Sequence, residues 1–482
     1  MLHSVNPLVF IFVFNLICIP SCFADWRKDV GFMALLYEAG ASMPDGKGIP
    51  VCQVEASIRM GGIEAWMLDP SMAVFKDKTI RDMTGTTKGI FSSHATGVGR
   101  LFYENGTSMA SGVDDVDFFA MGHWVQGGGL RFGSALKPAV HECRVANHSW
   151  VGAGLKKPAQ TAELLRRLDW WIEQDEYLHI VGLGNNTGVA PPLLASAFNV
   201  ISVGRSDASH SRQTSAVDAL YTKGRVRPDL VAPVTSTSAA APIVAGAAVI
   251  LLETAKNHPE LSTDLQQTGM TTRAGVAVSN AGRAETIRAV LMAGADRLTR
   301  SGKQGAAITD YRQDKANQTA NGLDVRYGAG QLNIQQSYRI LMAGEQNSSE
   351  DGGPGVTRYQ GFDYDPAFGG EGNSNTVATY PLPAVKEKTL LSVALIWHLR
   401  FSPDPAVAFP GVAELHDLNL ELVDVTGPTI VERSSSTEQN SENLWCPLMP
   451  GQSYALRVLP ATGSTAFLQD FAIAWSMQAE GK

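Results

Sequence analysis

Two short stretches of the chain place a serine where it is a candidate nucleophile. "NGTSMASG" (105–112) contains Ser108, and "STSAAAPIVAG" (236–246) contains Ser238. A serine hydroxyl is a weak nucleophile, so it needs a histidine to accept its proton, an acid to orient that histidine, and donors for the oxyanion that forms. It also benefits from the partial positive charge at the N-terminus of a helix. These requirements separate the two serines.

Only Ser238 is followed by a helical pattern. The residues after it are almost all Ala, Val, Ile and Gly, which predicts a buried helix over 239–256 with Pro242 in its first turn, where a missing N–H costs little. Ser108 is followed by "ASGVDDVDFF", a pattern that indicates a turn and then a strand. Plain chemistry therefore makes Ser108 a loop serine and favours Ser238.

The elements around these serines alternate as they do in α/β proteins. Strands are expected at 49–56, 116–123, 143–152, 177–184 and 198–205, and helices at 94–105, 161–176, 239–256 and 282–298. Strand-like runs separated by turns follow at 389–399, 418–425, 454–460 and 467–478, and they predict an all-β sandwich or jelly roll. A segment rich in Gly, Asp, Ser and Asn lies between the two parts and is interpreted as a linker or loop. The predicted organisation is 1–24 (signal peptide), 25–46 (short N-terminal segment), 47–345 (α/β domain), 346–375 (linker or loop) and 376–482 (β-sandwich).

The stretch "RVRPDLVAPVTSTSAAAPIVAGAA" (225–248) resembles a segment of the subtilisin-like serine peptidases, or subtilases. In that family the segment runs from Lys/Arg-Pro-Asp-x-x-Ala-Pro to Gly-Thr-Ser-x-Ala-x-Pro-x-Val-Ala-Gly. The resemblance extends over about 47–345 and places Ser238 at the nucleophile position. It implies a three-layer domain built on a parallel sheet and an endopeptidase that acts on peptide or protein substrates. The β-sandwich resembles the jelly-roll domain that follows some bacterial subtilase domains.

The resemblance also implies a general base and an acid. "SSHATGVGRLFYEN" (92–105) is similar to the family pattern His-Gly-Thr-x-Val and places His94 at the base. The strand "IPVCQVEA" ends on Glu55, where subtilases usually carry an aspartate. The extra methylene lengthens the arm by about 1.5 Å, and a misplacement of ~1 Å can cost ~10²-fold in rate. Either the backbone compensates or the site is inactive; Asp69 is a less favoured substitute, because no buried strand precedes it.

An oxyanion donor and a substrate-binding segment complete the implied site. "IVGLGNNTG" (180–188) resembles Ala-x-Gly-Asn-x-Gly and points to Asn185, with Asn186 as the register alternative; without the resemblance it is an ordinary turn. "RVANHSWVGAG" (144–154) resembles the edge strand on which subtilases bind an extended substrate. The residues that would offer backbone hydrogen bonds there are Ser149, Trp150, Val151 and Gly152.

Several departures from the family pattern support a different function. Ser236 and Ala95 replace two glycines, while Ile243 and Gly97 replace two histidines that do no chemistry. The segment 25–46 is too short for the folded inhibitory propeptide common in the family, so autoprocessing is not expected. The alternative hypothesis is a catalytically inert subtilase-fold module that binds peptides or proteins. Retention of the serine, histidine and asparagine together favours the enzyme.

Composition and the N-terminus limit the partners and the location. The net charge of −8 argues against a nucleic-acid partner, and no internal run is long enough for a membrane span. The apolar run "LVFIFVFNLICI" (8–19), followed by Cys22-Phe23-Ala24, predicts a signal peptide cleaved before Asp25 and a secreted or periplasmic protein. The start "MLHSVNP" lacks Lys and Arg, which weakens this prediction, and a lipoprotein at Cys22 is the minor alternative. Oligomeric state is not indicated.

Cysteine and acidic residues give weaker signals. Removal of 1–24 leaves Cys52, Cys143 and Cys446, which allow one disulfide at most. No Cys/His spacing suggests zinc. The acidic stretches 114–117 and 363–372 are compatible with calcium but carry no specific motif, and solvated acidic loops are the commoner interpretation. We therefore expect no cofactor.

Overall fold

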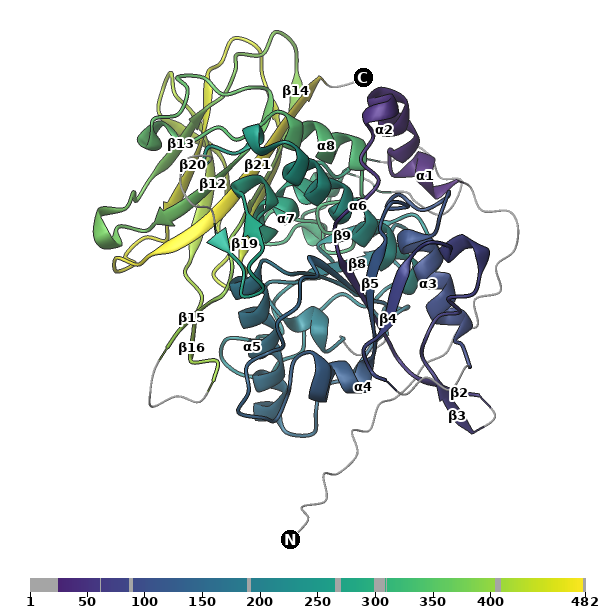
Figure 1. Cartoon of the computed structure of the whole chain (residues 1–482). Coiled ribbons are helices and arrows are strands. Elements are labelled where there is room, and N and C mark those ends of the chain that lie inside the picture. The colour runs from purple at the N-terminus through teal and green to yellow at the C-terminus, as the bar shows by residue number, and fades with distance from the viewer. Residues whose placement is uncertain are drawn as a thin grey trace.

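The computed structural model describes residues 25–60, 62–85, 90–188, 192–264, 270–298, 308, 310–403 and 409–479. The chain forms an α/β domain and a β-sandwich that lie side by side (Figure 1). The predicted signal peptide, 1–24, lies outside the described residues.

A seven-stranded sheet forms the centre of the α/β domain. Its strand order is β4-β5-β1-β6-β7-β8-β9, and every neighbouring pair is parallel. The strands are β1 (Val51–Glu55), β4 (Thr79–Asp82), β5 (Asp115–Ala120), β6 (Val145–His148), β7 (Leu178–Gly182), β8 (Ile201–Arg205) and β9 (Leu230–Ala232). Because the strands are parallel, their carboxyl ends lie at one edge of the sheet, and the loops that follow them are brought together there.

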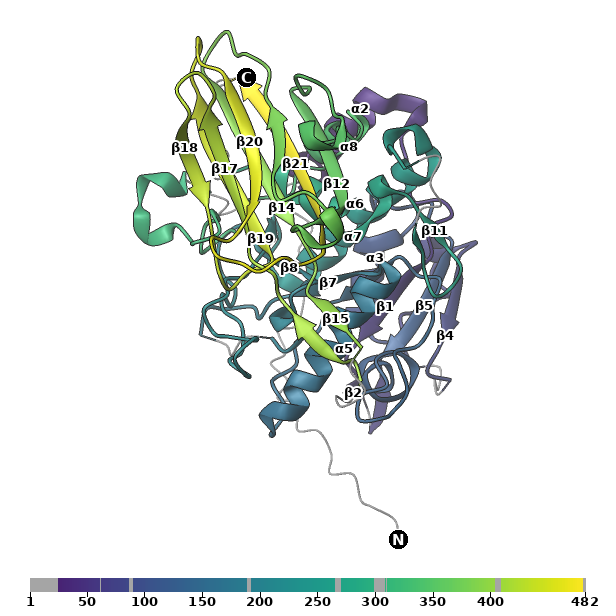
Figure 2. The ribbon, with the colours of Figure 1, turned by 90° about the vertical axis from the view of Figure 1, so that its left-hand side faces the viewer.

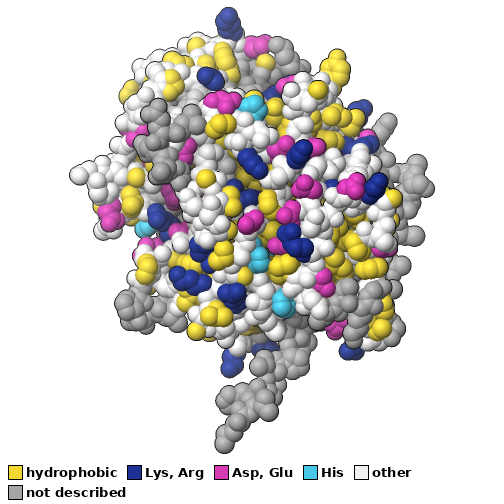
Figure 3. All heavy atoms as spheres, viewed as in Figure 1, with side chains coloured by type: hydrophobic (Ala, Val, Ile, Leu, Met, Phe, Trp, Pro, Cys, Tyr) yellow, Lys and Arg dark blue, Asp and Glu magenta, His cyan; other side chains and the backbone are white. Residues whose placement is uncertain are grey.

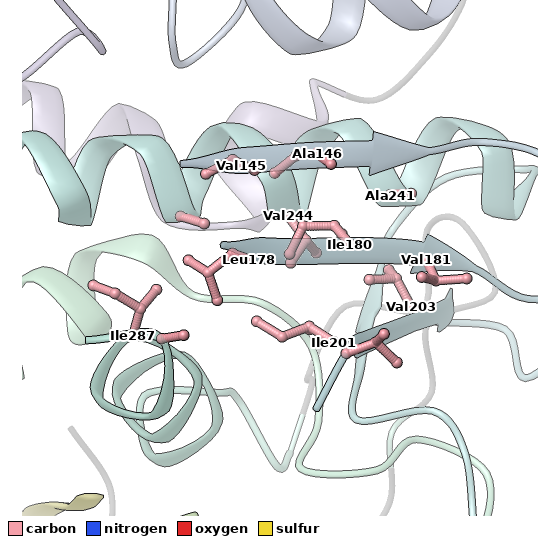
Figure 4. Packing of buried hydrophobic residues seen from close by; sticks show 14 of the residues in the cluster. Val145, Ala146, Leu178, Ile180, Val181, Ile201, Val203, Ala241, Val244 and Ile287 are labelled. Atoms are coloured by element: carbon pink, nitrogen blue, oxygen red, sulfur yellow. The ribbon is translucent and has the colours of Figure 1, made fainter. Parts of the chain in front are cut away.

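Helices cover both faces of this sheet. The helix α3 (Ser93–Tyr103) packs against α6 (Thr237–Asn257), while α5 (Pro158–Asp175) lies on the other side of the sheet (Figures 1 and 2). Figure 4 shows Ala241 and Val244 of α6 beside Val145 and Ile180 of β6 and β7. The further helices are α1 (Trp26–Asp29), α2 (Phe32–Ala39), α4 (Met121–His123), α7 (Ala284–Ala293) and α8 (Ile334–Met342).

The small side chains of α6 allow this helix to pack in the middle of the domain. Among the described helices it alone is long and apolar enough to cross a membrane, and almost all of it is buried inside the molecule. Because α6 begins at Thr237, Pro242 lies inside the helix and not in its first turn, so the expected position of Pro242 was wrong. Its missing N–H leaves the carbonyl of Ser238, four residues earlier, without its helical donor.

The C-terminal part is a sandwich of two antiparallel sheets, with strand orders β12-β21-β14-β19 and β13-β20-β17-β18. Its strands are β12 (Gln360–Phe368), β13 (Ala378–Pro381), β14 (Thr389–Ile396), β17 (Leu418–Asp424), β18 (Thr429–Ser434), β19 (Ser441–Leu448), β20 (Tyr454–Pro460) and β21 (Gln469–Ala479). Three short pairs complete the sheets: β2 (Ile58–Met60) with β3 (Ile63–Ala65), β10 (Met270–Thr271) with β11 (Ala277–Val278), and β15 (Arg400–Ser402) with β16 (Val412–Glu414).

Part of the predicted linker is a strand of the sandwich. β12 lies within 346–375 and pairs along its length with β21. Its glycine and aspartates gave it the composition of a loop, but Phe362 and Tyr364 are buried, and Asp363 accepts a hydrogen bond of 2.7 Å from the hydroxyl of Tyr380. A buried carboxylate with a partner is tolerated in a strand where an unpaired one would not be.

The apolar core of the α/β domain extends into the sandwich, which also has a core of its own. α7 packs on β14 and β21, and the core cluster of the α/β domain includes Phe362, Ile396 and Ala472 of the sandwich. On the face shown in Figure 3, acidic and basic side chains are intermingled.

Candidate active site

The end of β1 and the beginning of α3 bring an acid and a histidine together. β1 ends at Glu55, whose side chain is 1 % exposed, and Ser92 caps α3 by accepting the N–H of Ala95 at 3.2 Å. Oε2 of Glu55 lies 2.9 Å from Nδ1 of His94. Because a carboxylate accepts this hydrogen bond, Nδ1 carries the proton and Nε2 presents its lone pair.

The same contact shifts the titration of His94. Burial by itself lowers the pKa of this histidine, but the charge of Glu55 and the hydrogen bond to it have the larger combined effect, and the pKa of His94 is raised above its ordinary value. The imidazole is 30 % exposed, so one side of the ring remains open to solvent or a ligand. A partly exposed imidazole whose Nδ1 is bonded to a buried carboxylate is suited to accepting a proton at Nε2.

Ser238 lies at the N-terminus of α6. Ser236 caps this helix by accepting the N–H of Ala239 at 3.2 Å, so the serine that replaces a family glycine has a local structural role. In the described part of the chain the N–H of Ser238 has no hydrogen-bond partner, which leaves it available as a donor. The hydroxyl of Ser238 donates to the carbonyl of Ser149 at 3.2 Å, and no hydrogen bond joins it to His94 within those same ranges.

Asn185 lies next to Ser238. Its Oδ1 accepts the backbone N–H of Thr237 at 2.8 Å, and this contact fixes the orientation of the amide. The amide nitrogen is therefore turned away from Thr237, and together with the N–H of Ser238 it forms a pair of candidate donors. The register alternative, Asn186, is exposed, and its Oδ1 accepts the N–H of Gly188 at 3.1 Å within a turn.

The segment proposed to bind substrate follows β6. β6 is an interior strand that pairs with β1 and β7, so the expectation of an edge strand is wrong for residues 145–148. The four residues 149–152 follow the last residue of β6 and belong to no described strand. Their backbone is therefore the part of this segment that another chain can pair with.

Two carbonyls of the segment already have partners. The carbonyl of Gly152 accepts the N–H of Leu193 at 2.7 Å, and that of Ser149 accepts the hydroxyl of Ser238. Trp150 is buried and donates its indole N–H to Nδ1 of His148 at 3.2 Å, whereas Val151 is exposed. The free backbone groups of the segment are thus centred on residues 150 and 151.

The structure separates the other candidates from this site. Ser108 is buried beyond the far end of α3 from His94, and its hydroxyl donates to the carbonyl of Glu104 at 2.8 Å. Asp69 accepts the hydroxyl of Ser71 at 2.6 Å, and among the described contacts it has no hydrogen bond to His94. Neither residue has the contacts that a nucleophile or an orienting acid needs.

Two further residues of the site were not anticipated from the sequence. Gln53 and Tyr103 are both buried, and Gln53 donates to Glu55 at 2.8 Å while it accepts from Tyr103 at 2.6 Å. The available signal was a single glutamine in an otherwise apolar strand, two residues before the acid.

The described residues offer little to a metal. Within the described ranges no group of three or more His, Cys, Asp or Glu side chains is arranged to hold an ion. In the acidic stretch 114–117, Asp115 and Asp117 form ion pairs with Arg81. The three described cysteines, Cys52, Cys143 and Cys446, are free and buried.

A parallel seven-stranded sheet with helices on both faces, followed by an antiparallel sandwich, is the architecture of a subtilisin-like α/β domain with a β-sandwich extension. Residues 126–330 match the model of the subtilase family, Peptidase_S8. This match shows that residues 126–330 of the α/β domain are similar to the subtilase family of serine peptidases. It spans 149–152, Asn185 and Ser238, and it leaves Glu55 and His94 outside.

Solved structures give more distant likenesses. Fervidolysin from Fervidobacterium pennivorans, described as a keratinolytic enzyme related to subtilisin, is 14% identical over 89% of this chain and 70% of its own, with a TM-score of 0.36. A protease from Pseudoalteromonas arctica is 13% identical over 66% of this chain and 96% of its own, with a TM-score of 0.36. A mutant of the protease domain of PatA is 14% identical over 63% of this chain and 98% of its own, with a TM-score of 0.37. No curated protein matches the sequence.

Proposed function

We propose that the chain is an exported serine endopeptidase that hydrolyses peptide bonds through Glu55, His94 and Ser238. The observation that carries this proposal is the hydrogen bond of 2.9 Å between Oε2 of Glu55 and Nδ1 of His94. An inert domain has no need of a buried carboxylate against a histidine whose other nitrogen is open. The longer acid lies within hydrogen-bond distance of the histidine, which supports the proposal.

In the first step, Oγ of Ser238 attacks the peptide carbonyl carbon while its proton moves to Nε2 of His94. The carbonyl π bond becomes the lone pair of an oxyanion, and His94 becomes an imidazolium beside the carboxylate of Glu55. His94 then gives its proton to the leaving amine as the carbon–nitrogen bond breaks, and an acyl-enzyme remains. Water repeats the sequence and releases the acid, so the enzyme returns to its starting state.

The oxyanion is stabilised by two donors in this mechanism. The N–H of Ser238 is unbonded, and the orientation of Asn185 supports its amide nitrogen as the second donor. The substrate pairs as an extended strand with the backbone near Trp150 and Val151. Such donors act strongly because they are fixed before charge develops.

One observation favours the rival hypothesis, a binding module without catalysis. The hydroxyl of Ser238 donates to Ser149 and not to His94. In the enzymatic proposal, this hydroxyl rotates from the carbonyl of Ser149 to Nε2 of His94 when substrate binds. Catalytic hydrogen bonds of this type are often long or misaligned before substrate is present.

Labelling with a fluorophosphonate probe, together with hydrolysis of unstructured casein, tests the proposal. Wild type and Ser108→Ala are expected to react, since Ser108 is buried away from the site, whereas Ser238→Ala is expected to lose both labelling and hydrolysis. Glu55→Ala is expected to label slowly. A folded wild type that neither labels nor cleaves, with no inhibitor bound, would instead support the binding module.

Export has its own test. N-terminal sequencing of the protein recovered outside the cytoplasm is expected to begin at Asp25. A lipid-modified product that begins at Cys22 would support the lipoprotein alternative, and a product that retains the run 8–19 would contradict both.

A further inference from the structure

We infer that Gln53 is a positioning residue that fixes the carboxylate of Glu55 against His94 and so allows a glutamate to do the work of a shorter acid. This inference rests on the proposed peptidase function. Gln53 does not touch the reacting atoms and acts only through Glu55.

The side chain of Gln53 is fully hydrogen-bonded inside the protein. Gln53 is 0 % exposed and lies two residues before Glu55 on β1, so both side chains point to the same face of the strand. Its Nε2 donates to Oε1 of Glu55 at 2.8 Å and to the carbonyl of Ala95 at 3.0 Å. Its Oε1 accepts the hydroxyl of Tyr103 at 2.6 Å. The carboxylate of Glu55 and the carbonyl of Ala95 only accept, so they set the direction of the amide, and its oxygen faces the hydroxyl of Tyr103.

The partners of Gln53 come from the helix that carries the histidine. His94, Ala95 and Tyr103 all belong to α3. Gln53 thus links β1 to both ends of α3, independently of the contact between Glu55 and His94. One carboxylate oxygen of Glu55 is held by Gln53 and the other faces His94, so the rotation that an extra methylene permits is restrained from both sides.

Gly99 makes room for this arrangement. A Cβ added at Gly99 would lie 3.1 Å from the hydroxyl of Tyr103 and 3.3 Å from Oε1 of Gln53. It would also lie 3.0 Å from Cδ2 of Leu68. These distances are shorter than ordinary contacts, so an alanine here presses on the hydrogen bond between Gln53 and Tyr103. Gly97, on the same helix, has open space at the corresponding position and offers a matched control.

Four variants test the inference in kinetic assays on the full chain. Gln53→Met keeps the volume but removes the donor, and we expect kcat to fall about 10-fold to 100-fold with KM unchanged, because a catalytic group is displaced while the substrate backbone is not. Gly99→Ala is expected to lower kcat in the same way by a smaller factor. Gly97→Ala is expected to leave both constants at their wild-type values.

The pH dependence of kcat in Gln53→Glu distinguishes a positioning role from a merely structural one. When protonated, Glu at this position donates to Glu55 as the amide does; when ionised, it repels Glu55. The described titratable groups nearby are Glu55, His94, Tyr103 and Cys52. Because the new glutamate ionises and then repels Glu55 as pH rises, the ratio of variant to wild-type kcat is expected to fall with rising pH. A ratio independent of pH, together with a wild-type kcat in Gln53→Met, overturns the inference.

The proton on Nδ1 of His94 provides a second measurement that does not need turnover. In wild type its NMR resonance is expected far downfield because of the hydrogen bond to Glu55, and in Gln53→Met it is expected to move upfield. If wild type is inactive but this shift occurs, the peptidase proposal fails and the positioning role stands. If wild type is active and neither kcat nor the resonance changes in the variants, the positioning role fails alone. If Gln53→Met does not fold, kcat and the Nδ1 proton resonance of His94 are measured in Gly99→Ala, and the same outcomes support or overturn the inference.

Discussion

The hydroxyl of Ser149 donates to the carbonyl of Ser238 at 2.9 Å, and the hydroxyl of Ser238 donates to the carbonyl of Ser149 at 3.2 Å. Two hydrogen bonds therefore join the N-terminus of α6 to the segment that follows β6. The first bond has a specific cause. Pro242, four residues after Ser238, has no N–H to give to the Ser238 carbonyl, and the hydroxyl of Ser149 supplies the missing donor.

Ser149→Ala is expected to destabilise the protein by about 1–3 kcal/mol, because it leaves a part-buried carbonyl without a donor. Pro242→Ala restores a backbone N–H at that carbonyl. Urea unfolding of both single variants and the double variant forms a complete cycle. The loss caused by Ser149→Ala is expected to be smaller in the Pro242→Ala background, and strictly additive effects would show that the two sites are independent.

The charge of Glu55 is expected to matter more than its length. Glu55→Gln keeps the shape but removes the charge that stabilises the His94 imidazolium, and we expect kcat to fall about 10³-fold or more. Glu55→Asp keeps the charge but withdraws the carboxylate, and a loss of about 10²-fold is expected. Steady-state peptide hydrolysis measures both. A faster Glu55→Asp than wild type would mean that the site is built for the shorter acid.

The raised pKa of His94 sets the acid limb of the pH–rate profile. His94 must be neutral to accept the proton of Ser238, so kcat/KM is expected to rise with pH through a value above about 6.5, the ordinary pKa of histidine. The linked stability has the opposite sign: a raised folded-state pKa stabilises the protein below the unfolded pKa, and this contribution is lost as pH rises through the folded value. Glu55→Gln is expected to move the acid limb to lower pH. An unmoved limb would assign it to another group.

The large elements were predictable because their patterns are local. The run of small apolar residues after Ser238 predicts α6, and the buried strand that ends on Glu55 predicts β1; both are present, with boundaries shifted by one or two residues. β12 was missed because its buried aspartates are hydrogen-bonded by distant partners, as Asp363 is by the hydroxyl of Tyr380. Gln53 was missed for the same reason: its importance lies in contacts with α3, and Tyr103 is fifty positions away in the chain. Such pairings depend on tertiary structure, which a local pattern does not contain.

Asn185 has two separable roles, one for each end of its amide. Asn185→Ala removes both the candidate oxyanion donor and the acceptor of the Thr237 N–H, so we expect a loss of ~10²–10³ in kcat together with lower stability. Asn185→Asp keeps the acceptor but has no donor. Its kcat is expected to fall at least as far, while its melting temperature stays above that of Asn185→Ala. Retained turnover in Asn185→Asp would remove Asn185 from the oxyanion hole.

Buried ionisable groups at the junction of the two parts predict a pH-dependent stability. Oε1 of Glu285, at the start of α7, lies 2.7 Å from Nδ1 of His398 in the β-sandwich. Burial, together with the charge of Asp470, raises the pKa of Glu285 to about 7, and burial and the charge of Glu285 raise that of Glu176 to about 7. Burial lowers the pKa of His398, and this shift affects stability in the opposite direction to the raised pKa values of the two carboxyls.

The two carboxyl groups bind protons more tightly in the folded state, so their contribution to stability is present below about pH 4.5 and is lost as pH rises towards 7. For Glu285 alone the loss is of the order of 3 kcal/mol. His398 opposes it, because its lowered pKa favours folding above the ordinary histidine pKa and disfavours it below. Burial also raises the pKa of Glu173, which faces the same cluster, to about 7. With these three carboxyls against one imidazole, the melting temperature is expected to be higher at pH 5 than at pH 8.

Melting curves at both pH values, in wild type and in Glu285→Gln, check this expectation. The amide keeps the size of Glu285 but cannot ionise, so the variant is expected to lose part of the difference between pH 5 and pH 8, while Glu176 retains its own contribution. Glu387→Gln, which alters an exposed carboxyl of the β-sandwich, is the control and is expected to behave as wild type. A pH dependence that persists unchanged in Glu285→Gln would show that Glu285 does not contribute to it.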